Sequence, residues 1–212
     1  MTPTQKLDRR ILEAVSVRLI KAILLCLSIV NAQNLSAQNR IQGEIAGTWG
    51  WPISPEGFSR TLNSGAGAHA ALIIPLKPTL SLFAEGGFLS YRTDFIELGR
   101  ALRTPPEAIS GYNTYFYNFM IGLRVQPETE PVQVYITAGP GLARITRAET
   151  FDDEGPDFDA YSESALAVKL GGGITKPVAK RVDVFVAFDY VHVFTNEQTT
   201  ATMPVHLGFL IR

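Results

Sequence analysis

The sequence predicts an all-β protein, an eight-stranded antiparallel up-and-down barrel whose strands cross a membrane. In segment 182–194 the even positions are almost all large and apolar, whereas the odd positions include Asp183 and Asp189. A side-chain period of two indicates a strand. An apolar face opposite a face with carboxylates is typical of a strand that meets lipid outside a barrel and a polar interior inside it. Similar alternating segments recur along the chain.

Composition supports the same class of protein. Charged residues make up 18% of the 212 residues, and the mean hydropathy is slightly positive at +0.09. A soluble protein usually carries charge on about a quarter of its residues. The formal net charge of -1 argues against a nucleic-acid partner.

The N-terminal region has the features of a signal peptide. Basic residues precede or begin the apolar run 19–30, which is too short to cross a bilayer as a helix. Small residues suitable for cleavage follow it. We expect residues 1–38 to form the signal peptide, with cleavage after Ala32 or Ala37, and residues 39–212 to form the barrel domain.

The first four expected strands are 40–51, 64–74, 79–92 and 112–125. In the first, isoleucine, tryptophan and glycine alternate with mainly polar side chains. The second sets alanine, leucine and isoleucine against glycine and histidine. In the third, leucine and alanine face away from glutamate, and in the fourth, aromatic and aliphatic residues face away from asparagine and arginine.

The last four expected strands are 132–147, 161–175, 182–194 and 201–212. Each places valine, leucine, isoleucine, phenylalanine or methionine on one face and small or polar residues on the other. Longer connections follow the first, third, fifth and seventh strands, with shorter turns between. An even number of strands with short turns at one rim and long loops at the other is typical of outer-membrane barrels, and closure removes the edges that lipid would not tolerate.

One long connection, 93–111, contains a predicted helix. Phe95, Leu98 and Leu102 fall at helical spacing within residues 94–103. The apolar residues of this loop could contact a partner or pack as a lid on the barrel mouth.

Three segments carry a family resemblance: Phe83 to Gly87, Tyr135 to Gly141 and the closing His206 to Arg212. In their order and number, the strands resemble the OmpA/OmpX-type family of small outer-membrane barrels over nearly all of the expected mature chain. The resemblance implies a place in the bacterial outer membrane, contact with its lipid, and insertion by the barrel assembly machinery. It also implies a role in envelope integrity, adhesion or assembly with envelope partners. The family usually ends on an aromatic residue, whereas this chain ends on Arg212.

The inward faces of the expected strands gather charged residues. These are Glu44, Glu85, Arg124, Lys169, Asp183 and Asp189, accompanied by His69, Asn118 and His206. Counting back from the turns places Lys169 almost opposite Asp189, and His69 near Glu85. An eight-stranded interior is only wide enough to be filled by side chains, and buried charges must be paired or solvated. We therefore expect a polar, largely plugged interior, with gating or proton passage as the alternative.

Aromatic side chains gather at the long-loop ends of several strands. They are Trp49, Trp51, Tyr115, Tyr117 and Tyr190. Tryptophan and tyrosine favour the membrane interface, so we expect a girdle there rather than a ligand-stacking site.

The third long connection, 148–160, is strongly acidic. It lacks the ordered spacing and closing glutamate of an EF-hand, so a solvated loop is expected, with a weak divalent-cation site as the alternative.

No catalytic, cofactor or metal motif stands out. The nearest approximation to a catalytic arrangement is His192 with Ser162 or Ser164. We therefore expect a non-enzymatic integral outer-membrane protein with four surface loops. A narrow small-solute channel is one alternative, and a soluble ligand-binding barrel of lipocalin type, with its apolar face inside, is another.

Overall fold

A computed structural model describes residues 41–103, 105, 109–110, 113–127, 132–147, 151–152, 161–195 and 199–212. The expected signal peptide and most of the acidic segment 148–160 lie outside these residues.

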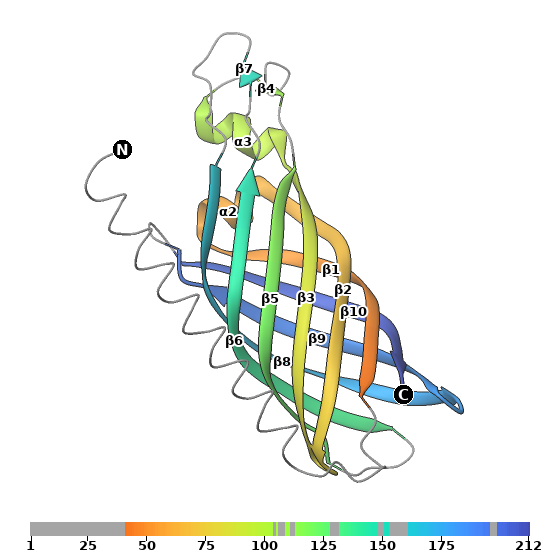
Figure 1. The fold of residues 1–212 in the computed structure, drawn as a ribbon. Helices are drawn as coiled ribbons and strands as arrows, with labels where there is room; N and C mark the ends of the chain where they lie inside the picture. Colours follow the sequence, from red (N-terminus) through yellow and green to blue (C-terminus); the bar gives the residue numbers. More distant parts are fainter. Residues whose placement is uncertain are drawn as a thin grey trace, which may run out of the picture. The chain divides into compact units, whose positions relative to one another are not determined.

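Eight strands close into a barrel in the order β1-β10-β9-β8-β6-β5-β3-β2, with β2 returning to β1 (Figure 1). Every neighbouring pair is antiparallel. The strands are β1 (Gln42–Ser54), β2 (Leu62–Lys77), β3 (Leu80–Thr93), β5 (Thr114–Val125), β6 (Gln133–Arg147), β8 (Tyr161–Ala179), β9 (Val182–Val193) and β10 (Thr200–Ile211). The predicted eight-stranded antiparallel barrel is confirmed.

The connections at the long-loop rim contain short elements. Helix α2 (Glu56–Thr61) follows β1, and helix α3 (Phe95–Leu102) follows β3, while β4 (Ile109–Ser110) pairs with β7 (Phe151–Asp152). The Asp94 carboxylate caps α3 by accepting hydrogen bonds from the backbone N–H groups of Ile96 and Glu97. Neither helix, nor any other in the described residues, has the length and hydropathy of a membrane span.

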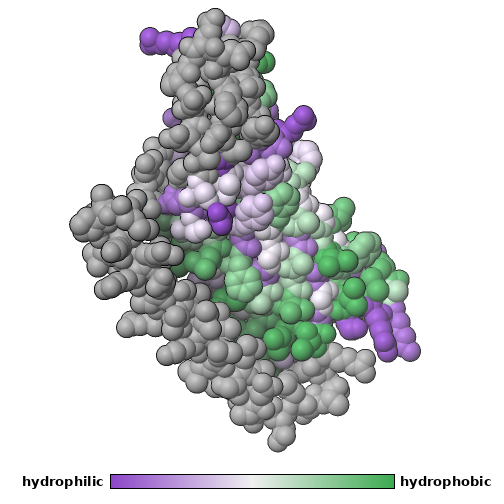
Figure 2. Space-filling view, turned by 45° about the horizontal axis from the view of Figure 1, so that its top comes forward, coloured by the Kyte–Doolittle hydropathy of each residue, from purple (hydrophilic) through white to green (hydrophobic). Residues whose placement is uncertain are grey.

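Burial alternates along the strands as the sequence predicts. In β9, Asp183, Phe185 and the following odd positions are buried, whereas Phe188 and Tyr190 are exposed. The outward face therefore carries a broad apolar surface: Leu170 is 60% exposed and Leu207 is 62% exposed. Figure 2 shows hydrophobic side chains gathered on the visible flank of the barrel.

Inside the barrel, apolar layers lie on both sides of a charged one. Along β9, Phe185 lies on the turn side of Asp189, and Val191 and Val193 lie on its loop side; all three apolar side chains are almost fully buried. Strand β3 repeats the order with Phe83, Glu85 and then Leu89 and Tyr91. From α2, Phe58 packs edge-on against Tyr91 with ring centroids 5.9 Å apart.

Candidate functional site

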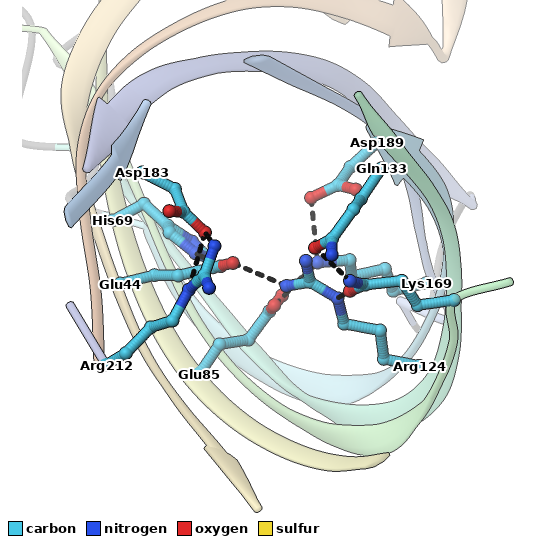
Figure 3. Close-up of polar contacts among 10 residues, drawn as sticks. Glu44, His69, Glu85, Arg124, Gln133, Lys169, Asp183, Asp189 and Arg212 are labelled. Carbon is cyan, nitrogen blue, oxygen red and sulfur yellow. Dashed lines mark hydrogen bonds and ion pairs between the residues drawn. The ribbon is translucent and has the colours of Figure 1, made fainter. Parts of the chain in front are cut away.

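The charged layer centres on Lys169, which β8 holds in the barrel interior. Its Nζ donates to both Glu85 carboxylate oxygens at 2.6 Å and lies 2.8 Å from Asp189 Oδ2. All three side chains are at most 6% exposed. Because a buried ammonium is costly without partners, two carboxylates from opposite sides stabilise it there. Lys169 thereby joins β8 to β9 and, across the barrel, to β3 (Figure 3).

Two histidines extend this cluster. His206 Nε2 lies 3.0 Å from Asp189 Oδ2, and because an ionised carboxylate only accepts, the imidazole N–H is the donor. Its other ring nitrogen, Nδ1, lies 2.8 Å from Thr48 Oγ1. The His69 ring lies 4.4 Å from the His206 ring between centroids, so the cluster continues to β2.

A second ion pair lies next to His69. Arg124 Nη1 donates to Glu44 Oε1 at 2.5 Å, and Glu44 Oε2 lies 4.0 Å from His69 Nε2. The guanidinium carbon of Arg124 stands 3.5 Å from the centre of the Tyr135 ring, a cation–π contact.

Polar contacts also close the turn-side rim. Arg124 Nε donates to Gln126 Oε1 at 3.1 Å, and Gln126 Nε2 donates to Gln133 Oε1 at 2.5 Å. Arg212 Nε donates to Asp183 Oδ2 at 2.9 Å, so the last residue of the sequence pairs with a carboxylate of β9.

Little space is left in the charged layer. A cavity of about 20 Å³ is lined by the charged residues and by Phe83, Tyr135 and Phe185. That volume holds about one water molecule. Two buried groups that line it, Arg124 Nη2 and Thr137 Oγ1, have no hydrogen-bond partner among the described residues.

All six predicted interior charges are buried, at 2% to 6% exposure. The strand register differs from the counted one: Lys169 lies opposite Val191, because β8 continues to Ala179 and its turn therefore comes later in the chain than the predicted one. The long lysine side chain still reaches Asp189. His69 lies opposite Gly87, and its nearest charged partner is Glu44 rather than the expected Glu85.

The five predicted girdle aromatics lie toward the loop-side ends of β1, β5 and β9. Trp49, Trp51, Tyr117 and Tyr190 are exposed on the outward face, and Tyr115 is half-buried. Tyr115 and Tyr117 each stack with or tilt against Phe88, which the sequence pattern did not place in the girdle.

His192, Ser162 and Ser164, which the sequence offers for catalysis, lie on β8 and β9, whereas most of the acidic segment 148–160 lies outside the described residues. His192 lies opposite Val168, with Nδ1 3.3 Å from the Tyr190 hydroxyl. In the described part of the chain, no three His, Cys, Asp or Glu side chains group as metal ligands would.

The closed barrel, its apolar outside and its charged inside together define an integral transmembrane β-barrel. The chain belongs to the outer membrane protein beta-barrel domain family, whose model matches residues 22–212. The protein is therefore located in the bacterial outer membrane.

Solved structures share this fold. Neisserial surface protein A is 15% identical with a TM-score of 0.56, covering 81% of this chain and 94% of that one. A major outer membrane protein from Thermus thermophilus is 13% identical with a TM-score of 0.56, covering 81% and 99%. The attachment invasion locus protein of Yersinia pestis, solved with the heparin analogue sucrose octasulfate, is 12% identical with a TM-score of 0.51, covering 81% and 99%. No curated protein sequence matches the chain.

Proposed function

We propose that the protein is a non-enzymatic, non-conducting outer-membrane anchor that presents its long loops at the cell surface. The observation that carries this proposal is the charged layer around Lys169, which lies between apolar side chains along β3 and β9. A conducting pore needs a continuous wet path. Here the space within the layer has room for about one water molecule.

The anchoring role follows from the two faces of the barrel. The apolar outward face is stabilised by lipid, and the internal ion pairs bind strands that are far apart in sequence, so the barrel is a rigid support for the loops. Through these loops the protein serves envelope integrity, adhesion or assembly with envelope partners. Its insertion uses the barrel assembly machinery.

Single-channel recording in planar bilayers tests the proposal. The wild-type protein is expected to give no steady conductance at moderate voltage. Steady, ion-selective openings would favour the narrow small-solute channel instead. A lipocalin-like soluble barrel needs an apolar interior and a charged exterior, the reverse of the burial of Lys169 and the exposure of Leu170.

Export is part of the same proposal. Residues 1–38 act as a signal peptide that is removed after Ala32 or Ala37, leaving the barrel domain in the membrane. Mass spectrometry of the membrane-located protein gives the mature N-terminus. A protein that retains Met1 in the outer membrane would contradict the cleavage.

A further inference from the structure

Arg144 lies on the lipid-facing side of β6. Its chain neighbours Ala143 and Ile145 are buried in the barrel, whereas Leu142 and Arg144 are exposed on the outside. A guanidinium on this surface is unusual because a lipid-facing arginine costs about 2–4 kcal/mol at the bilayer midplane and about 0–1 kcal/mol near the interface.

The strand register places Arg144 near the loop-side interface. It lies opposite Tyr117 of β5 and Ser164 of β8. Strand β6 ends at Arg147, and a strand rises about 3.3 Å per residue, so Arg144 lies roughly 10 Å from that end. This is the level of the exposed Tyr117 ring, at which lipid headgroups are expected.

Hydroxyl groups hold the guanidinium by one edge. Arg144 Nε donates to Ser162 Oγ at 3.0 Å, and Thr146 Oγ1 lies 3.3 Å from the same oxygen. This contact orients the side chain through Nε. Among the described residues, Arg144 forms no ion pair that would occupy its two terminal nitrogens.

The outward faces of the eight barrel strands offer no anion to this arginine. Their described positions carry three cations, Arg92, Arg144 and Lys176, and no aspartate or glutamate. A charged group that faces lipid needs a partner of opposite charge. Phosphate suits arginine because its oxygens accept two parallel N–H bonds from the planar guanidinium.

We propose that Arg144, anchored by Ser162 and flanked by Tyr117 and Ser164, binds a phosphate group of an outer-leaflet lipid headgroup. The site would fix an anionic lipid against β5, β6 and β8. It goes beyond the anchoring function and does not depend on whether the barrel conducts.

Native mass spectrometry of the exported protein tests this site. The protein in nonionic detergent is titrated with lipid A that carries two phosphates, with the same glycolipid after removal of its phosphates, and with inorganic phosphate. The variants are R144Q, R144K and S162A. K176Q is the matched control, because Lys176 is an outward-facing cation at the other end of β8.

The wild-type and K176Q proteins are expected to bind the phosphorylated lipid equally, and R144Q about tenfold more weakly, as for loss of a charge-assisted hydrogen-bonded contact. R144K keeps the positive charge but cannot donate two parallel N–H bonds, and S162A removes the hydroxyl that orients the guanidinium. Both variants are expected to bind the phosphorylated lipid with affinities between those of the wild type and R144Q. Circular dichroism confirms that each variant is folded, and S162A keeps the test decisive if R144Q does not fold.

Four results would overturn the proposal. These are unchanged lipid binding by folded Arg144 and Ser162 variants, an equal loss in K176Q, equally tight binding of the dephosphorylated glycolipid, and full competition by inorganic phosphate at the lipid's concentration. The last would mean that the site takes free phosphate. None of them bears on the conductance recording, so the two proposals fail independently.

Discussion

At the scale of single residues, Lys169 is the side chain on which the interior depends most. Removing its ammonium in K169M leaves Glu85 and Asp189 as buried carboxylates that have lost their shared cation. Breaking a buried ion pair in this way costs about 3–5 kcal/mol. We expect that loss in urea unfolding of the protein in lipid vesicles or detergent, together with a lower melting temperature.

Lys180, an exposed residue of the β8–β9 turn, is the matched control for this change. K180M should alter the free energy of unfolding by no more than about 0.5 kcal/mol. The prediction is contradicted if K169M and K180M are equally stable in unfolding and neither gives a conductance in planar bilayers. The ion pairs would then not support the barrel.

Glycines give a second contrast at this scale. A Cβ at Gly171 would collide with the Asp189 carboxylate, whereas a Cβ at Gly47 would meet no atom within 4 Å. We expect G171A to destabilise the barrel by about 1–3 kcal/mol, as overpacking does, and G47A to be nearly neutral. Thermal melting in detergent compares them, and equal melting temperatures would contradict the interior packing.

At the scale of elements, the predicted and observed strands agree because alternation fixes which face is buried. The ends of the strands are harder to predict from the sequence than the strands themselves. Strand β1 continues to Ser54 and α2 forms at Glu56–Thr61, where the sequence predicts only a long connection after a strand that ends at residue 51. Strand β8 continues to Ala179, beyond the expected end at 175. Pro and Gly mark a change of direction but do not fix its position.

The partners of interior residues could be predicted only within a hairpin. Lys169 and Asp189 belong to adjacent strands, so counting from their turn brings them close together although the turn comes later in the chain than predicted. The contact of Lys169 with Glu85 crosses the barrel interior between β8 and β3. A contact of this kind depends on barrel closure and side-chain reach, and no local pattern encodes it. The contact between Asp183 and Arg212 is not predicted by strand alternation, because Arg212 follows the end of β10 at Ile211.

The cap of α3 gives a prediction at the element scale. D94A removes the carboxylate that accepts from two backbone N–H groups, a change that costs a helix about 1 kcal/mol. Hydrogen exchange should therefore quicken in α3 while the barrel strands keep their protection. D94N retains an accepting oxygen and should exchange nearly as slowly as the wild type. Equal exchange in D94A and the wild type would show that the cap does not stabilise the helix.

At the scale of the whole molecule, the apolar outward face of the barrel meets lipid. Ile174 of β8, which lies between the level of Tyr190 and the turn, and Val178, near the turn, are 49% and 58% exposed. I174R should cost about 2–4 kcal/mol in a bilayer, and V178R about 0–1 kcal/mol, because the cost of arginine falls toward the interface. Unfolding from lipid vesicles measures both. Equal costs would mean that these positions do not differ in depth.

Quenching of tryptophan fluorescence by lipids brominated on their acyl chains is the most direct test that the apolar face of the barrel points toward the membrane. The chain has two tryptophans, Trp49 and Trp51, and both are exposed on the outward face of β1 at 49% and 44%. We predict strong quenching in vesicles of the brominated lipid and little quenching by aqueous iodide. Strong iodide quenching with no effect of the brominated chains would contradict a barrel whose apolar face meets the membrane.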